Sequence, residues 1–472
     1  MQWKTIWRSL KSRDMQKRLL IVLGILVAYR FLAHVPVPLA EPKQLQEVIS
    51  TILNNSNFGG FLNLLSGGAL ASVSIMLVGL SPYITASIVM QLLTKAIPRM
   101  EELHKDGESG RRKINQWTRM LTLPLAIVQS IAFIFILRQQ QLAANSTVDI
   151  TSNATPLQWI LMVGALTAGA MLLMWLGELI TEQGIGNGMS LLIFAGIISQ
   201  LPSTVQLVAN SIFNVSTDAD KLHLFNWILP VNAFIVWLML ALAAAGLIVL
   251  YIMVKINEAQ RIITVNYAKR VQGNRAYGGV QSILPVKLIT AGVVPVIFAV
   301  AFLQIPNFVG QFMAASGDAG QKQIGQLLIT WFQSPQFASL AAPTLTTFIY
   351  PVAYFMLIVV FTFFYTNIVF NSAEIAENLQ KQNGFIANVR PGIQTEKHLG
   401  QMVNRLTLFG AFALGIIATL PFITEYILAL FNIPAQNLAI GGTGLLIAVS
   451  VTLETLRQIN SRALMVTYDQ DY

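Results

Sequence analysis

The chain lacks cysteine and carries very little charge. Its 472 residues include no Cys, only four His and 11% charged residues, whereas soluble domains carry roughly 25% charged residues. Without cysteine there is no disulfide framework, cysteine metal site or thiol nucleophile. The four histidines are scattered along the chain, at His34, His104, His223 and His398. The composition therefore argues against a soluble domain and gives no reason to expect a metal centre or any other cofactor.

Long uncharged stretches take the place of the missing charge. Hydrophobic residues make up 54% of the chain, and several uncharged stretches approach the roughly 20 residues that cross a bilayer core. In lipid every backbone polar group needs a partner within the protein, so such stretches predict helices rather than open sheets. We expect an all-α polytopic membrane protein with ten transmembrane helices, near 19–35, 74–94, 116–138, 157–178, 188–206, 229–254, 286–305, 347–370, 405–425 and 438–457.

Positive charge is divided unevenly between the two sides of these spans. Most Lys and Arg fall in 1–18, 95–115, 179–187, 255–285, 371–404 and the C-terminal segment. The positive-inside rule makes this side cytoplasmic, so both termini are expected inside. Residues 1–18 also place Trp3, Ile6, Trp7 and Leu10 at helical spacing, which predicts an amphipathic helix on the membrane surface rather than a solvated basic tail.

Two basic connections, 255–285 and 371–404, are longer than most helix–helix connections. Both contain turn-forming Gly and Pro, as in "VQGNRAYGGV" and "NGFIANVRPGIQ". Ordered basic loops on one face predict docking to a large acidic partner, such as ribosomal RNA or an acidic groove on a motor protein. Contact with lipid headgroups is the alternative.

No catalytic constellation is found. "GIGNGMS" at 184–190 lacks the Lys and the preceding strand of a phosphate loop, so it predicts a tight helix-to-helix turn. Few ionisable residues fall within the spans, although Arg119 and Glu178 lie near span ends. Coupled transporters keep such residues at membrane depth. The sequence therefore predicts no enzyme and favours a passive conduit or a scaffold over the remaining alternative, a small-molecule secondary transporter.

One stretch, "SGGALASVSIMLVGLSPYITASIVMQLL" at 66–93, begins with small residues and ends as a span. The segment just before that span, near 60–71, is too short to cross a bilayer. Irregular backbone at membrane depth is tolerated only inside protein or along a cavity. We therefore expect a re-entrant half-helix that plugs a cavity, with an ordinary interfacial loop as the alternative.

Motifs along the whole chain resemble the SecY family, the central subunits of the bacterial protein-conducting channel. They include "KDGESGRRKINQWTR", "GELITEQGIGNGMSLLIFAGI", "NYAKRVQGNRAYGG", "AGVVPVIFA", "AENLQKQNGFIANVRPG" and "GGTGLLIAVSVTLETLRQI". The resemblance implies two five-helix halves related by inverted pseudo-symmetry. They would be 19–206 and 229–457, joined by an external hinge at 207–228 and flanked by a cytoplasmic helix at 1–18 and a cytoplasmic tail at 458–472.

The resemblance also implies four sets of functional residues. The plug would occupy 60–72 and include Phe61, Leu62, Leu64, Leu65, Ser66, Gly67, Gly68 and Ala69. The apolar pore ring would consist of Ile84, Ile88, Met189, Ile193, Ile297 and Ile447. The lateral gate would include Ser87, Gln91 and Thr290. Partner docking would fall to Arg261, Lys269, Arg270, Arg275 and Arg390. Ile262 and Asn274 depart from the family, which often has Arg at both positions.

The function implied by the resemblance is protein transport without chemistry. Such a channel passes unfolded secretory polypeptides across the plasma membrane and releases transmembrane segments sideways into the lipid bilayer. The implied partners are the small membrane subunits SecE and SecG, the motor ATPase SecA, the ribosome, and signal sequences and nascent polypeptides.

Overall fold

The computed structural model describes residues 13–37, 74–143, 155–213, 221–224, 227–267, 270–272, 275–277, 281–314, 318–333, 335, 345–430 and 442–470. A helix lies at each of the ten predicted spans within these ranges. They are α2 (Arg13–Leu32), α5 (Ser81–Ala96), α7 (Glu108–Ala143), α8 (Pro156–Gln183), α9 (Gly188–Phe213), α10 (Ala233–Glu258), α11 (Val294–Ala314), α13 (Ile349–Val369), α15 (Ile393–Leu430) and α16 (Gly442–Gln470).

Six of the described helical segments are individually long and apolar enough to cross a membrane. They fall in α7, α8, α10, α11, α13 and α15. Only 6% of the apolar stretch of α10 is buried. Its side chains are therefore almost all on the surface, as contact with lipid requires. The prediction of an all-α polytopic membrane protein is confirmed.

Contacts along the chain divide it into two compact units. The first contains Met1–Asn232, Val300–Tyr350 and Phe422–Tyr472, and the second contains Ala233–Ala299 and Pro351–Pro421. The halves predicted at 19–206 and 229–457 stay a prediction.

In the first unit, helices pack in the series α5–α7–α8–α9–α16, and α2 packs on α8. One hydrophobic cluster of this unit joins the turn at 77–78 to α7 and α8, and it contains Val37, Leu77, Val78, Ala126, Phe133, Ile134, Met162, Leu166 and Ala170. Gly169 permits this contact, because a Cβ there would overlap the carbonyl oxygen of Ile75. The turn before α5 therefore rests directly on the backbone of α8.

Local sequence sets several helix ends in this unit. Thr155 caps α8 through a capping box with Gln158, and Gly184 ends that helix with a φ of 67°, a conformation that favours glycine. Helix α5 ends before Ile97, which is extended because it precedes Pro98. The short helix α6 (Pro98–Lys105) follows, in a segment that the sequence treated as a loop.

The second unit contains a sheet that the sequence analysis missed. Strands β3 (Gln260–Tyr267), β6 (Gln281–Lys287) and β7 (Gly384–Ile386) form an antiparallel sheet in the order β6-β3-β7. The side chains of Ile263, Val286, Ile386, Leu399 and Val403 form its core. The basic connections 255–285 and 371–404, predicted as separate docking loops, are therefore hydrogen-bonded to each other.

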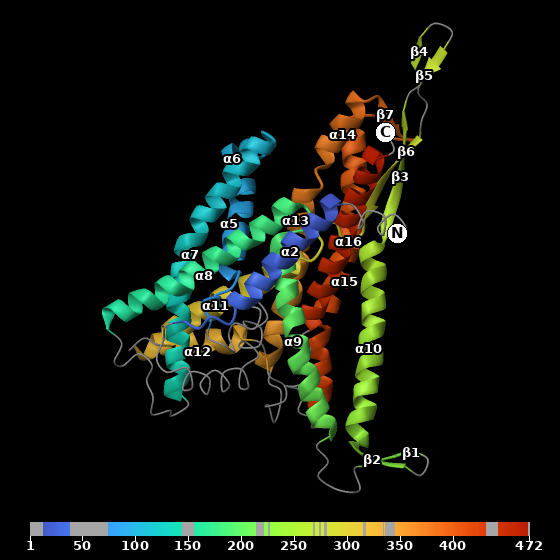
Figure 1. The fold of residues 1–472 in the computed structure, drawn as a ribbon. Coiled ribbons are helices and arrows are strands. Elements are labelled where there is room, and N and C mark those ends of the chain that lie inside the picture. The colour runs from blue at the N-terminus through green and yellow to red at the C-terminus, as the bar shows by residue number, and fades with distance from the viewer. Residues whose placement is uncertain are drawn as a thin grey trace. The chain divides into compact units, whose positions relative to one another are not determined.

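Two predicted spans begin later than expected. The helix expected at 74–94 begins at Ser81, after a turn at 75–80, and the helix expected at 286–305 begins at Val294, after β6 (Gln281–Lys287) and a turn. Gly292, with a φ of 63°, adopts a conformation open mainly to glycine and turns the chain between strand and helix. Beyond β3 and β6, strands β4 (Arg270–Gln272) and β5 (Arg275–Tyr277) pair as a hairpin that extends away from α10 (Figure 1).

Three further elements lie in predicted connections. The hairpin of β1 (Lys221–Leu224) and β2 (Trp227–Asn232) covers part of the expected hinge. Helix α12 (Ala319–Phe332) follows α11, and α14 (Ser372–Lys381) precedes β7. None of these elements was predicted, because short amphipathic segments carry a weaker signal than an apolar span.

Candidate functional site

The turn between α8 and α9 places Met189 and Ile193, two predicted pore-ring residues. A Cβ at Gly188 would overlap the carbonyl oxygen of Gly177, so the two helices are in backbone contact here. Thr181 fixes the turn, because its hydroxyl donates to the Gly177 carbonyl over 2.9 Å and accepts from the Gly188 amide over 2.9 Å. The tight turn expected at 184–190 is present.

The side chain of Met189 lies against Gly177, where a Cβ would overlap its sulfur. One helical turn further on, Ile193 is only 3% exposed. Helix α9 also packs against α16, on which Ile447 is 6% exposed. Of these three predicted ring residues, Ile193 and Ile447 are therefore buried and Met189 is half-buried, and they lie on two helices that pack together.

The other ring positions lie on two further helices. Ile84 and Ile88 are buried on α5, four residues apart and hence on one face. Ile297 is half-buried on the part of α11 that belongs to the second unit. Because that residue is in a different unit from the other five, closure of the ring stays a prediction.

The predicted gate residues are polar side chains at or near helices. Gln91 donates from Nε2 to the hydroxyl of Ser87 over 3.2 Å on α5, while its buried Oε1 has no hydrogen-bond partner among the described residues. Thr290 precedes α11, and its hydroxyl donates to the carbonyl of Lys287 over 3.1 Å. The first two residues belong to one compact unit and Thr290 to the other, so their pairing as a gate stays a prediction.

Four of the five predicted docking residues lie on or next to the sheet and its hairpin. Arg261 is exposed on β3, and Arg390 is exposed between β7 and α15. The hairpin register pairs Gln272 with Arg275 and Arg270 with Tyr277. Lys269 lies outside the described residues, as does the whole predicted plug at 60–72.

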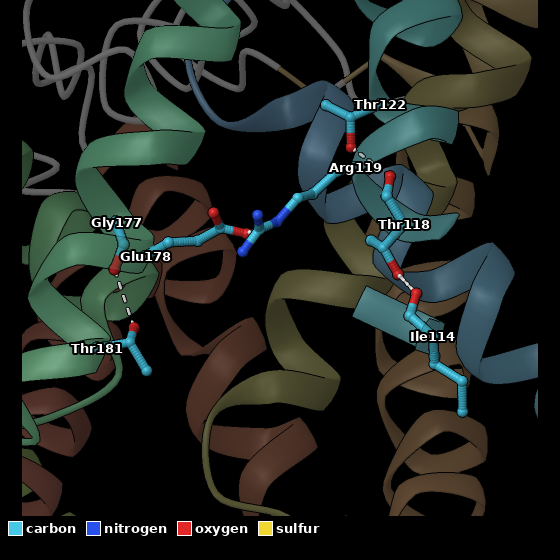
Figure 2. A network of polar contacts seen from close by, with 7 residues as sticks. All are labelled: Ile114, Thr118, Arg119, Thr122, Gly177, Glu178 and Thr181. Atoms are coloured by element: carbon cyan, nitrogen blue, oxygen red, sulfur yellow. Dashed lines mark hydrogen bonds and ion pairs between the residues drawn. The ribbon is translucent and has the colours of Figure 1, made fainter. Parts of the chain in front are cut away.

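An ion pair that was not predicted joins α7 to α8. Arg119 donates from Nε to Glu178 Oε1 over 2.6 Å, and the Glu178 side chain is 18% exposed. Figure 2 shows the two side chains reaching toward each other from separate helices. Nearby hydroxyls bond along α7 itself, from Thr118 to Ile114 and from Thr122 to Thr118. The sequence did offer a signal for this pair, because Arg119 and Glu178 carry opposite charges near the ends of successive predicted spans.

We expect this ion pair to stabilise the α7–α8 contact modestly. Partly exposed pairs contribute about 0.2–1 kcal/mol, so a double-mutant cycle with Arg119→Gln and Glu178→Gln should give a coupling energy near the upper end of that range. The measurement is thermal unfolding of the purified protein in detergent. The control cycle uses Arg112 and Glu108, an exposed pair within one helix, and should give a smaller coupling. Equal coupling in both cycles would contradict the prediction.

Comparisons with known proteins agree with the geometry. The sequence model of the SecY family matches residues 74–456. The chain is 39% identical to the protein translocase subunit SecY of Streptomyces galbus and 37% identical to that of Mycobacterium bovis, each over 98% of both chains.

Solved structures share the fold at lower identity. A SecY channel studied for the role of its plug domain is 18% identical, with a TM-score of 0.59 over 94% of this chain and 91% of that one. Sec61 from a canine ribosome–channel complex is 17% identical, with a TM-score of 0.53 over the same shares. From the family match and the extent of the identity, the chain belongs to the SecY family.

Proposed function

We propose that the chain is the channel-forming subunit of a protein translocase. In this role it conducts unfolded polypeptides across the plasma membrane and keeps both termini in the cytoplasm. The observation that carries the proposal is the similarity to protein translocase subunits over 98% of both chains. These relatives are translocase subunits rather than small-molecule transporters, so the secondary-transporter alternative has no support from them.

The pore ring would act as an apolar gasket. The side chains of the ring are apolar and carry no strong hydrogen-bonding group; they belong to Ile84, Ile88, Met189, Ile193, Ile297 and Ile447. Such a ring gives a passing polypeptide no specific partner, and a dewetted apolar constriction resists ions. The plug at 60–72 would close the outer side of the same path. The chain supplies no chemistry of its own in this scheme, so the energy for transport comes from a partner.

Lateral release would occur between α5 and α11, with Ser87, Gln91 and Thr290 at the seam. A signal sequence is an apolar helix, so it partitions into lipid once the seam opens. The two halves, 19–206 and 229–457, would part about the external hinge at 207–228. This arrangement lets one channel serve both secreted chains and membrane proteins.

Partner docking would use the sheet and hairpin of the second unit. Arg261, Arg270, Arg275 and Arg390 come from connections that β3 and β7 join in one sheet. A basic surface of this kind suits an acidic partner such as the SecA motor or ribosomal RNA. The similar Sec61 channel was solved in a ribosome–channel complex. SecE and SecG would be the small membrane subunits of the assembly.

Deletion of residues 60–72 tests the conduit. In planar bilayers the intact protein should hold a seal against ions, whereas the deletion variant should leak, because the plug no longer fills the outer side of the path. Ion conductance at fixed voltage is the measurement, and translocation of a secretory precursor into proteoliposomes checks that the variant is folded. A deletion variant that translocates but seals as well as the intact channel would refute the plug assignment.

A further inference from the structure

Helix α12 packs on the last turns of α11 by direct backbone contact. A Cβ at Gly325 would overlap the amide nitrogen of Ala314 and lie 2.6 Å from the carbonyl oxygen of Gly310. A Cβ at Gly310 would in turn lie 2.9 Å from the carbonyl oxygen of Gly325. Asn307 adds a polar contact, since its Nδ2 donates to the carbonyl of Phe332 over 3.4 Å. The two helices are therefore closely packed at this end of α11.

The surface of α12 away from this contact has two distinct stripes. Ile324, Leu327 and Trp331 are exposed by 51%, 47% and 39%, and their spacing of three and four residues puts them on one side of the helix. The second stripe is polar, exposed and spaced by four residues, and it consists of Lys322, Gln326 and Thr330. Helix α12 thus has a packing face, an apolar stripe and a polar stripe.

The position of α12 directly after a membrane-spanning helix bears on its depth. Helix α11 is long and apolar enough to cross the membrane and ends at Ala314, and α12 begins at Ala319. Along α11 another apolar stripe is exposed, formed by Phe302, Ile305, Val309 and Phe312. In a membrane-spanning helix an exposed apolar stripe is suited to contact with lipid. The stripe on α12 therefore follows directly in the chain on an apolar surface suited to lipid.

We propose that α12 is an interfacial helix whose apolar stripe lies at the boundary between lipid headgroups and acyl chains. A helix with an apolar side, a polar side and a tryptophan suits this layer, and tryptophan concentrates at membrane interfaces. Contact with the lipid surface would limit the movement of α12. Because Gly310 and Gly325 bring the two helices into backbone contact, the end of α11 would be restrained as well. The inference rests on the membrane-spanning assignment of α11 and is independent of conduction.

Single cysteines can test the depth of α12, because the chain has no native cysteine. The variants Leu327→Cys and Gln326→Cys are labelled with an environment-sensitive fluorophore in the full-length protein in phospholipid vesicles. Lipids with a doxyl group near the headgroup should quench the fluorescence of the label at 327. Aqueous iodide, added to both sides of the membrane, should quench that label about threefold less than the label at 326. The matched label at 326, on the polar stripe, should be open to iodide and weakly quenched by the lipids.

Two other outcomes would overturn the proposal. Equal iodide access at 327 and 326 would mean that the apolar stripe faces water. Shielding of 327 from both iodide and doxyl lipids would mean that protein covers the stripe, from a second copy or another subunit. The variant Ile324→Cys repeats the measurement on the same stripe, so the test survives a poorly folded Leu327→Cys protein.

Discussion

Replacing Ile88 and Ile193 together by glycine should make the closed channel leak ions. Both side chains are buried, at 6% and 3% exposure, and both belong to the predicted ring that would exclude hydrated ions. Removing two branched side chains widens and wets the constriction. We expect conductance in planar bilayers to rise by roughly tenfold, while the variant keeps its capacity to translocate a secretory precursor.

A second double variant controls for the cost of glycine in a helix, about 1 kcal/mol at each site. It combines Val89→Gly with Ile198→Gly. These two residues also lie on α5 and α9, but their side chains are 36% and 44% exposed. This control should remain sealed. If both double variants leak equally, general loosening explains the conductance and the ring assignment fails. If neither leaks while both remain folded, these positions do not form the seal.

Gly188→Ala should strongly destabilise the first unit. The new Cβ would overlap the carbonyl oxygen of Gly177, and backbone cannot move aside as a flexible side chain can. Overpacking of this kind costs about 1–3 kcal/mol or more, which is a large fraction of the 5–15 kcal/mol that holds a typical domain. We expect a lower melting temperature in detergent and a reduced yield of monodisperse protein.

The matched substitution is Gly164→Ala on α8. No described atom comes within 4 Å of a Cβ at that position, and alanine is favoured over glycine in a helix by about 1 kcal/mol. The same chemical change should therefore leave the melting temperature unchanged or raise it. A Gly188→Ala protein as stable as the Gly164→Ala protein would show that α8 and α9 are not in backbone contact.

Local chemistry made much of the molecule predictable. A membrane span is a long apolar run because lipid forbids unpaired backbone groups, so each of the ten expected spans coincides with a helix. The turn at 184–190 could be expected because glycine there allows close approach and a positive φ. Spacing also put Met189 and Ile193 on one face of α9. The choice of pore-ring residues, in contrast, came from resemblance and not from physics.

Contacts between distant residues were beyond prediction from sequence. Strand β3 pairs with β7 through Val265 and Ile386, and no local pattern indicates which distant segment completes a short sheet. The ion pair of Arg119 with Glu178 depends on the rotation of α7 and α8 about their axes, and spacing within one helix does not fix that rotation. Helix α12 was missed for a related reason, since its apolar stripe is short and its packing glycine has no side chain to reveal it.

The sequence by itself determined the class of protein, the approximate places of its long apolar helices and the family, because these follow from local composition and from motifs. Only the tertiary structure decided that the two basic connections form one sheet, that Thr181 fixes the α8–α9 turn, and that Gly325 joins α12 to α11. Each of these depends on atoms brought within contact distance by folding, and a linear pattern does not encode that distance.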